Sequence, residues 1–294
     1  MTRLITIVLL IAVLGAFGCS NSTTSPGNLK LKTLLGGLEY PKGLWIVGDK
    51  VYFTEVNGRY TPYGGKVALS VYDQAAVSTT VIINNPENSD AVVVMEDGTM
   101  YLTSWHGAIP GNFGKVSMVD PVTHVESQVT DLQIASNDMY LESDSDIVVV
   151  GESNDVNANS MYILPSGSYG SPSVFHSGLG ISKCVSEAQG VVYYSDYYDI
   201  KRYISNGTLE TFAASKSVES LSATPLWVYY ADTESGTVAR INVSSRKTEV
   251  LVGHLNSPTA VRWDATNKKL YILDAGTDAN QFKDGTLKVV TGLN

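Results

Sequence analysis

The amino-acid sequence predicts an all-β fold, namely a six-bladed β-propeller with four antiparallel strands in each blade. Three observations predict it. A short string that closes an apolar run recurs six times, the 294 residues include 26 Gly and 17 Tyr, and a segment near the N-terminus aligns with one near the C-terminus. Short apolar runs separated by turn residues favour strands over long helices, so helices are expected to be nearly absent.

The recurring string marks the second strand of each blade. It reads YFTE, YLTS, VVGE, YYSD, YYAD and YILD, and its successive copies end 36 to 49 residues apart. This period is typical of a blade built from four short strands. The last residues of the six copies are Glu55, Ser104, Glu152, Asp196, Asp232 and Asp274.

The other strands of each blade are predicted from the apolar runs around this string. A first strand lies about ten residues upstream of each copy. A third strand follows downstream and opens at Gly65, Gly114, Ser160, Asp199, Gly236 and Gly285. An outer strand follows in five blades, at residues 77–83, 125–130, 173–175, 209–213 and 247–252.

The sixth outer strand is predicted at the other end of the chain. Residues 30–42, KLKTLLGGLEYPK, align without a gap on residues 247–259, KTEVLVGHLNSPT. An N-terminal strand at about residues 30–36 would therefore complete the last blade. Such a closure joins both ends of the domain in one sheet, so that no strand edge is left open at the seam.

The first 19 residues predict an export signal. One charge, at Arg3, precedes an apolar stretch at residues 4–17, which is shorter than the roughly 20 residues that span a bilayer. Cys19 follows Gly18 and precedes a polar string, an arrangement that resembles the lipobox of bacterial lipoproteins. The resemblance implies lipidation of Cys19 and a membrane-anchored protein of the bacterial cell envelope, with ordinary secretion as the alternative. The expected divisions are residues 1–19 as signal peptide, 20–28 as flexible tether and 29–294 as one propeller domain.

Charge and cysteine content narrow the class of protein. The chain has 20 Lys and Arg against 29 Asp and Glu, a net charge of −9. Because phosphates are bound by basic patches, this balance argues against a nucleic-acid partner. Cys184 is the one free thiol left after removal of the signal, and its surroundings in ISKCVS predict a small buried residue. We expect the domain to be a monomer held together by packing and strand pairing.

The C-terminal third carries a family resemblance. Residues 226–276, which include YYADTESGTVARINV and NKKLYILDAG, resemble the YWTD repeat of LDL-receptor-type propellers. They are more loosely similar to NHL, TolB-like and gluconolactonase-type (SMP-30) six-bladed propellers. The resemblance implies that the aspartates closing the repeated strings are structural residues that bind backbone N–H groups.

Two rings of side chains are predicted at one face of the propeller, where first strands begin and second strands end. The second-strand ring is Glu55, Ser104, Glu152, Asp196, Asp232 and Asp274. The first-strand ring is Lys42, Asp90, Asp138, Lys183, Glu219 and Thr259, with Asn137 and Ser182 as the alternatives if the register in blades three and four differs by one residue. Together the rings hold eight carboxylates against two ammonium groups, a balance that would attract Ca²⁺ or another divalent cation into the channel. The candidate metal ligands are Glu55, Glu152, Asp196, Asp232 and Asp274, although a structural role is preferred for the three aspartates.

The residues of the first-strand ring differ from blade to blade, which is typical of a binding site more than of a repeated structural contact. Long loops at residues 56–65, 105–114 and 275–285 are expected to cover the same face, and Trp105 and His106 add apolar surface and hydrogen-bonding groups there. We therefore expect a binding or scaffold module for a peptide, glycan or partner protein. Its candidate binding residues are Lys42, Asp90, Trp105, His106, Asp138, Lys183 and Glu219.

The alternative function is a metal-dependent lactonase or esterase. It is implied by the resemblance to gluconolactonases, with Glu55, Asp90, Asp138 and Glu152 as ligands and Asp196 or Asp232 as the base. A third hypothesis, a lyase like the streptogramin-opening propellers, would need histidines near the axis, where the sequence places only His106. Nucleophile-elbow, zinc-protease, phosphate-loop and dinucleotide motifs are absent from the sequence.

Overall fold

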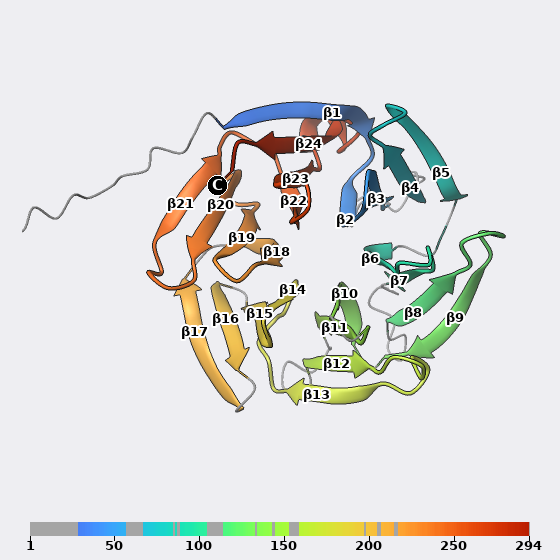
Figure 1. The fold of residues 1–294 in the computed structure, drawn as a ribbon, viewed down its shortest axis with the longest axis vertical. Coiled ribbons are helices and arrows are strands. Elements are labelled where there is room, and N and C mark those ends of the chain that lie inside the picture. The colour runs from blue at the N-terminus through green and yellow to red at the C-terminus, as the bar shows by residue number, and fades with distance from the viewer. Residues whose placement is uncertain are drawn as a thin grey trace, which may run out of the picture.

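The computed structural model is an all-β propeller. It describes residues 29–56, 67–84, 86, 89–104, 114–132, 134–142, 145–152, 159–196, 198–204, 207–214 and 217–293. In these residues six antiparallel sheets of four strands each surround a central axis (Figure 1). The only helix among the described residues is a single 3₁₀ turn, η1 (Asp278–Asn280). The predicted fold class is thereby confirmed.

The first and second strands of the blades occupy the inner part of the ring (Figure 1). The first strands are β2 (Pro41–Val47), β6 (Ser89–Val94), β10 (Ala135–Leu141), β14 (Val185–Ala188), β18 (Val218–Ala223) and β22 (Pro258–Asp264). The second strands each end at the residue that the repeated string predicts: β3 (Lys50–Glu55), β7 (Met100–Ser104), β11 (Ile147–Glu152), β15 (Val191–Asp196), β19 (Trp227–Asp232) and β23 (Lys269–Asp274).

The third and outer strands complete each sheet toward the rim. The third strands are β4 (Ala68–Asp73), β8 (Lys115–Val119), β12 (Ser160–Leu164), β16 (Asp199–Ile204), β20 (Thr237–Asn242) and β24 (Gly285–Thr291). The outer strands are β5 (Ser78–Asn84), β9 (Glu126–Asp131), β13 (Ser173–Ser177), β17 (Thr208–Ala214), β21 (Thr248–Val252) and, from the N-terminus, β1 (Lys30–Leu38). We call the face at which first strands begin the top face and the opposite face the bottom face.

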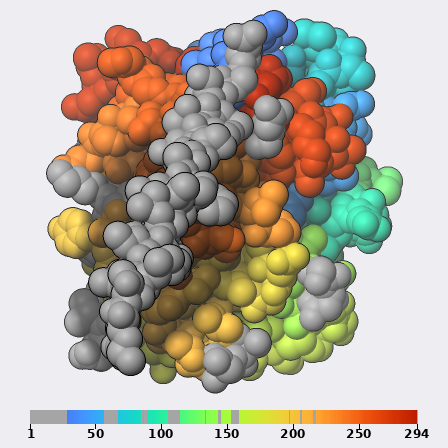
Figure 2. Space-filling view, turned by 60° about the vertical axis from the view of Figure 1, so that its left-hand side comes forward, coloured from blue at the N-terminus to red at the C-terminus, as the bar shows by residue number. Residues whose placement is uncertain are grey.

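The N-terminal strand closes the ring, as the sequence predicts. The last sheet has the order β1-β24-β23-β22, and β1 pairs antiparallel with β24 from Lys30 opposite Thr291 to Leu38 opposite Gly285. In the space-filling view the blue of β1 adjoins the red and orange of the C-terminal strands (Figure 2). Both ends of the domain are therefore held in one sheet.

The hydrophobic core lies between neighbouring blades. Second strands supply much of it, and in β23 every residue from Leu270 to Asp274 is buried. At the seam, Phe53 of blade one is fully buried in one cluster with Tyr271 and Leu287 of blade six. Outer strands such as β21 and β9 are mostly exposed or half-buried. The inner strands, which are buried on both faces, thus pack blade against blade.

Gly151 shows how tightly a first strand packs on a second strand. A Cβ atom at Gly151 would lie 2.0 Å from the carbonyl oxygen of Ala135, whereas one at Gly253 would meet nothing within 4 Å. Gly151→Ala should therefore lower the free energy of unfolding by about 1–3 kcal/mol, the usual cost of overpacking, and Gly253→Ala should leave it nearly unchanged. Urea unfolding followed by circular dichroism measures both values. Equal stability of the two variants would contradict this packing.

The predicted signal peptide, Cys19 and the tether lie outside the described residues, so the lipid anchor stays a prediction. Within the described part of the chain, no helix is long and apolar enough to span a bilayer.

Candidate functional site

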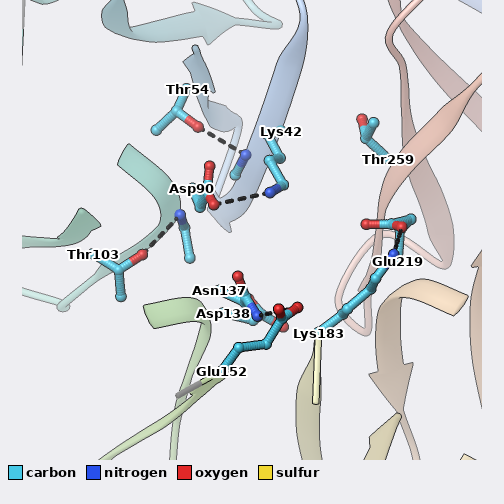
Figure 3. Close-up of polar contacts among 12 residues, drawn as sticks. Lys42, Thr54, Asp90, Thr103, Asn137, Asp138, Glu152, Lys183, Glu219 and Thr259 are labelled. Carbon is cyan, nitrogen blue, oxygen red and sulfur yellow. Dashed lines mark hydrogen bonds and ion pairs between the residues drawn. The ribbon is translucent and has the colours of Figure 1, made fainter. Parts of the chain in front are cut away.

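The first strands carry the candidate site because most of them bulge where they begin at the top face. The pairing register between first and second strands shifts at the start of β2, β6, β10, β18 and β22. A bulge frees a residue from the strand ladder and redirects its side chain. The redirected residues include Lys42, Asp90, Asn137, Glu219 and Thr259, which Figure 3 shows gathered around the mouth of the channel.

In blade three, the residue that belongs to the first-strand ring lies one position before Asp138, the residue primarily predicted. The register of this blade skips Asn137, between Ser136 opposite Gly151 and Asp138 opposite Val150. The ring position of this blade is therefore Asn137, the alternative that the sequence left open, with Asp138 directly beside it.

Hydroxyl groups of second strands bind the backbone N–H groups at these starts. The N–H of Gly43 donates to Thr54 Oγ1 at 2.7 Å, and the N–H of Ala91 donates to Thr103 Oγ1 at 3.1 Å (Figure 3). In blade four, the N–H of Lys183 donates to Ser195 Oγ at 2.9 Å. This explains why Thr or Ser precedes the last residue in three copies of the repeated string: its hydroxyl satisfies a buried donor that the sheet does not pair.

The charged residues of the mouth form ion pairs across blade boundaries. Lys42 of blade one lies with its Nζ 2.9 Å from Asp90 Oδ2 of blade two, and the two side chains are 15% and 10% exposed. Lys183, just before β14, forms an ion pair with Glu219 of blade five. Both predicted ammonium groups are thus neutralised by carboxylates of the same ring.

The uncharged residues of the mouth also connect neighbouring blades. Asn137 donates from Nδ2 to Ser182 O of blade four at 3.1 Å and to Glu152 Oε1 of its own blade at 3.3 Å. Thr259 Oγ1 donates to Pro41 O, across the seam, at 2.6 Å. Hydrogen bonds within the protein therefore occupy part of the polar groups at the mouth. The cavity beneath measures about 20 Å³ and is lined in part by Lys42, Asp90, Asp138 and Glu219, which is room for about one water molecule.

Asp138 is a carboxylate deep in the channel. Its Oδ1 accepts the N–H of Met139 at 2.8 Å and its Oδ2 accepts the N–H of Val185 at 3.0 Å. Burial raises the pKa of Asp138 to about 6, although these two N–H donors and the charges of Arg262 and Lys42 act in the opposite direction. The group is therefore poised to change its charge just below neutral pH.

The raised pKa of Asp138 predicts a pH dependence of stability. Between its unfolded pKa near 3.8 and its folded pKa of about 6, the folded state holds a proton that the unfolded state has lost, so stability falls as pH rises through this window. Asp138→Asn cannot titrate. We expect the melting temperature of the wild type to decline relative to that of Asp138→Asn between pH 4 and pH 6.5, and parallel curves from thermal melts would contradict the assignment.

The acids that close the second strands hold nearby chain segments. Asp274 Oδ1 accepts the N–H of Ser257 at 2.8 Å, Asp232 Oδ1 accepts that of Ser235 at 3.0 Å, and Asp196 forms an ion pair with Lys201. In addition, Glu55 Oε1 accepts the N–H of Glu39 at 2.9 Å, next to the seam. These contacts agree with the structural role that the family resemblance implies for the aspartates.

The same acids do not assemble into a metal centre with the groups around them. Among the described residues, no three His, Cys, Asp or Glu side chains lie close enough together to hold one metal ion. The expected Ca²⁺ ligands Glu55, Glu152, Asp196, Asp232 and Asp274 are each the terminal residue of a different blade's second strand. The donor set that the structure describes therefore does not fit a resident cation.

Trp105 and His106 fall outside the described residues, as do most of the loops at 56–65 and 105–114. In the third loop, Thr277 and Asn280 bind the carboxylate of Asp284, which receives a Thr277 N–H at 2.8 Å. The contribution of Trp105 and His106 to the top face stays a prediction.

Arg262 is a channel residue that the sequence analysis missed. It lies opposite Tyr271, the first residue of the string YILD, in the pairing of β22 with β23. The corresponding residues opposite the other strings are Trp45, Val93, Met139, Ser186 and Ser222. If the six first strands are aligned by the residue that pairs with the start of each repeated string, Arg262 is the one charged residue at this position.

Comparison with known proteins supports the fold. No protein-family model and no curated protein sequence matches the chain. Among solved structures, the chain is similar to a calcium-binding regucalcin from Agrobacterium tumefaciens, with a TM-score of 0.70 and 14% identity over 90% of this chain and 94% of that one. A gluconolactonase from Xanthomonas campestris gives a TM-score of 0.66 and 12% identity over 90% and 89%. An auxiliary nutrient binding protein from Bacteroides thetaiotaomicron gives 0.68 and 9% over 90% and 76%.

These similarities define the class of fold. The chain is a six-bladed β-propeller with gluconolactonase- and SMP-30-like propellers among its structural neighbours.

Proposed function

We propose that this propeller is an exported, lipid-anchored binding module. Its top-face mouth would bind a polar group of a peptide, a glycan or a partner protein. The observation that carries the proposal is the mouth itself, where charged side chains from four blades form two ion pairs across blade boundaries. Such a surface is polar, specific in shape and electrically balanced.

The geometry supports binding at the surface of the mouth. The space beneath the ring, about 20 Å³, is far smaller than the roughly 300–1,000 Å³ of an ordinary small-molecule pocket. A ligand would therefore rest on Lys42, Asp90, Lys183 and Glu219 and exchange hydrogen bonds with them. One structural neighbour is an auxiliary nutrient binding protein, which agrees with a binding role for this fold.

An array of short peptides and oligosaccharides tests the proposal. The Lys42→Met/Asp90→Leu variant removes both members of an ion pair, so that no buried charge is left without a partner and folding is retained. The matched control, Arg240→Met/Glu249→Leu, removes a pair of 2.8 Å in the outer half of blade five. We expect the array ligands of the wild type to be lost by the first variant and kept by the second. Identical binding profiles for all three proteins would refute a site at the mouth.

The lipid anchor needs a separate measurement. Mass spectrometry of the protein from bacterial membranes should find residues 1–18 removed and a diacylglycerol on Cys19. Cys19→Ser should release the protein from the membrane fraction. An unmodified mature N-terminus in the soluble fraction would instead support ordinary secretion.

Lactone hydrolysis is the second candidate function. One structural neighbour is a gluconolactonase, which favours this function. Asp138 also favours it, because its pKa of about 6 suits a general acid or base near neutral pH. Among the described residues no three acids lie close enough together to hold one metal ion. Hydrolysis of a sugar lactone by the wild type, with and without added Ca²⁺, and its loss in Asp138→Asn would establish this activity in place of binding alone.

A further inference from the structure

The larger of two cavities along the channel opens at the bottom face. Its volume is about 860 Å³, which is in the range of sites for drug-sized molecules. The ends of first strands line it, with Trp45, Tyr140, Arg262 and Trp263, and the start of β19 adds Trp227. Arg262 borders both this cavity and the small space under the top-face mouth. The bottom cavity is therefore large enough to hold a whole small ligand.

Arg262 is a partly buried cation whose hydrogen-bonding groups are unused. Its guanidinium carbon lies 3.6 Å from the centroid of the Trp45 ring and 5.5 Å from that of Tyr140. Within the part of the chain that the structure describes, no hydrogen bond or ion pair reaches it; Asp138 acts on it only electrostatically. Burial lowers the pKa of Arg262 to about 10, which leaves it charged at neutral pH. The N–H donors of this charged guanidinium are therefore available to an anionic group that enters the cavity.

Arg240 is a second arginine that stacks on a tryptophan, and its hydrogen bonding can be compared with that of Arg262. It also lies over a tryptophan, with its guanidinium carbon 3.9 Å from the centroid of the Trp227 ring. Unlike Arg262, it donates from Nε to Glu249 Oε2 at 2.8 Å. The stacking of arginine on tryptophan therefore does not require the guanidinium donors to stay free, and the isolation of Arg262 is specific to the channel.

Several of the other polar groups around the cavity are already engaged, whereas Lys268, an exposed residue of its lining, has no hydrogen bond or ion pair among the described residues. Ser222 Oγ accepts the N–H of Trp263 at 3.0 Å, Thr224 is hydrogen-bonded to Trp227, and Asp264 accepts the N–H groups of Thr266 and Asn267. Glu187 accepts the N–H of Gly190. Few groups remain for a polyhydroxylated sugar, whereas a single acidic group could bind Arg262.

The remaining wall is flat and apolar. Trp263 stacks on Tyr229 at 5.2 Å with an interplanar angle of 10°, and both Trp263 and Trp45 are only half-buried. The hydroxyl of Tyr140 has no hydrogen bond within the described residues and is electrostatically coupled to Arg262 and, with the opposite sign, to the carboxylates of Glu187 and Glu142. Aromatic side chains offer planar surface to planar ligands, and guanidinium binds carboxylate with two parallel hydrogen bonds.

We propose that the bottom-face cavity binds an aromatic carboxylate, whose carboxylate contacts Arg262 and the Tyr140 hydroxyl while its rings lie against Trp45 and Trp263. This site is separate from the top-face mouth. The bottom-face cavity would bind a small molecule independently of any partner that binds at the top-face mouth.

Isothermal titration calorimetry with two matched probes tests the site. Biphenyl-4-carboxylate carries the acid, and biphenyl-4-methanol has the same rings without the charge. We expect the wild type to bind the acid about 10- to 100-fold more tightly than the alcohol, the range for a hydrogen-bonded charge. Equal binding of the two probes, or no binding of the acid at millimolar concentration, would overturn the proposal without the use of any variant.

Variants then locate the contact. Arg262→Met should weaken binding of the acid about 10- to 100-fold and leave binding of the alcohol unchanged, and Arg262→Lys should give an intermediate loss because it keeps the charge without the planar donors. Arg240→Met serves as the control and should bind the acid as the wild type does. Lys42→Met/Asp90→Leu should also bind it normally, which separates this site from the top-face mouth. Undiminished binding of the acid by Arg262→Met would refute the assignment.

Discussion

Removal of β1 is expected to abolish the cooperative unfolding of the propeller. The strand pairs with β24 along its length, and Leu38 at its end is buried with Phe53 and Tyr271 at the seam. Without β1, the last sheet would present an open edge and a partly uncovered core. We expect the free energy of unfolding to fall by more than about 4–5 kcal/mol, which is beyond the effect of nearly all single substitutions.

Two truncations separate the role of β1 from that of the residues before it. A chain lacking residues 1–28 retains β1 and should melt as the full propeller does. A chain lacking residues 1–38 should give a broad, low-temperature transition by calorimetry and near-UV circular dichroism. A synthetic peptide of residues 30–38 should restore part of the transition by adding to the free edge. A normal melt for the shorter chain would show that the ring does not depend on this closure.

Replacement of Arg262 by methionine is expected to stabilise the protein. In the absence of ligand the guanidinium is half-buried and has no ion pair or hydrogen bond among the described residues, so folding removes part of its water and only the contact with Trp45 and the charge of Asp138 compensate. Methionine keeps the packing against Trp45 and Tyr140. We expect the free energy of unfolding to rise, but by less than the gain of about 1–4 kcal/mol when a fully buried ion pair is replaced by apolar residues of similar volume, because Arg262 is half-buried and borders the cavity.

Arg240→Met is the matched control for this gain. It removes a second arginine from a tryptophan face, but this arginine pairs with Glu249, so its removal strands a partner and should lower stability. Urea unfolding followed by tryptophan fluorescence measures both variants. If Arg262→Met is less stable than the wild type, the charge has a structural partner and the ligand proposal loses its main support.

The sequence predicts much of this fold because blades repeat. Each second strand ends at the residue that closes its string, from Glu55 in β3 to Asp274 in β23, since the apolar run must stop where the strand leaves the core. The predicted closing strand at about residues 30–36 is observed as Lys30–Leu38. Local pattern and an internal alignment suffice for features that every blade must share.

The site is less predictable because its geometry depends on contacts between blades. A bulge in β10 makes Asn137 the ring residue of blade three, and nothing in the alternation of apolar residues reveals an extra residue in a strand. The ion pair of Lys42 with Asp90 joins first strands 48 residues apart in sequence. Arg262 is a single charge within an apolar run, and its isolation is visible only when Trp45 and Tyr140 are placed around it.

The direction in which the chain enters the propeller has a consequence for how the molecule would stand on a bilayer. Lys30 pairs with Thr291 near Leu293, a residue that borders the bottom cavity. If the chain is anchored at Cys19, the nine residues from 20 to 28 can span at most about 30 Å. This short segment would hold the Arg262 cavity toward the lipid headgroups and turn the ion-paired mouth outward. Amphiphilic acids leaving the membrane would then reach one end of the disc, and large partners in the surrounding space would reach the other.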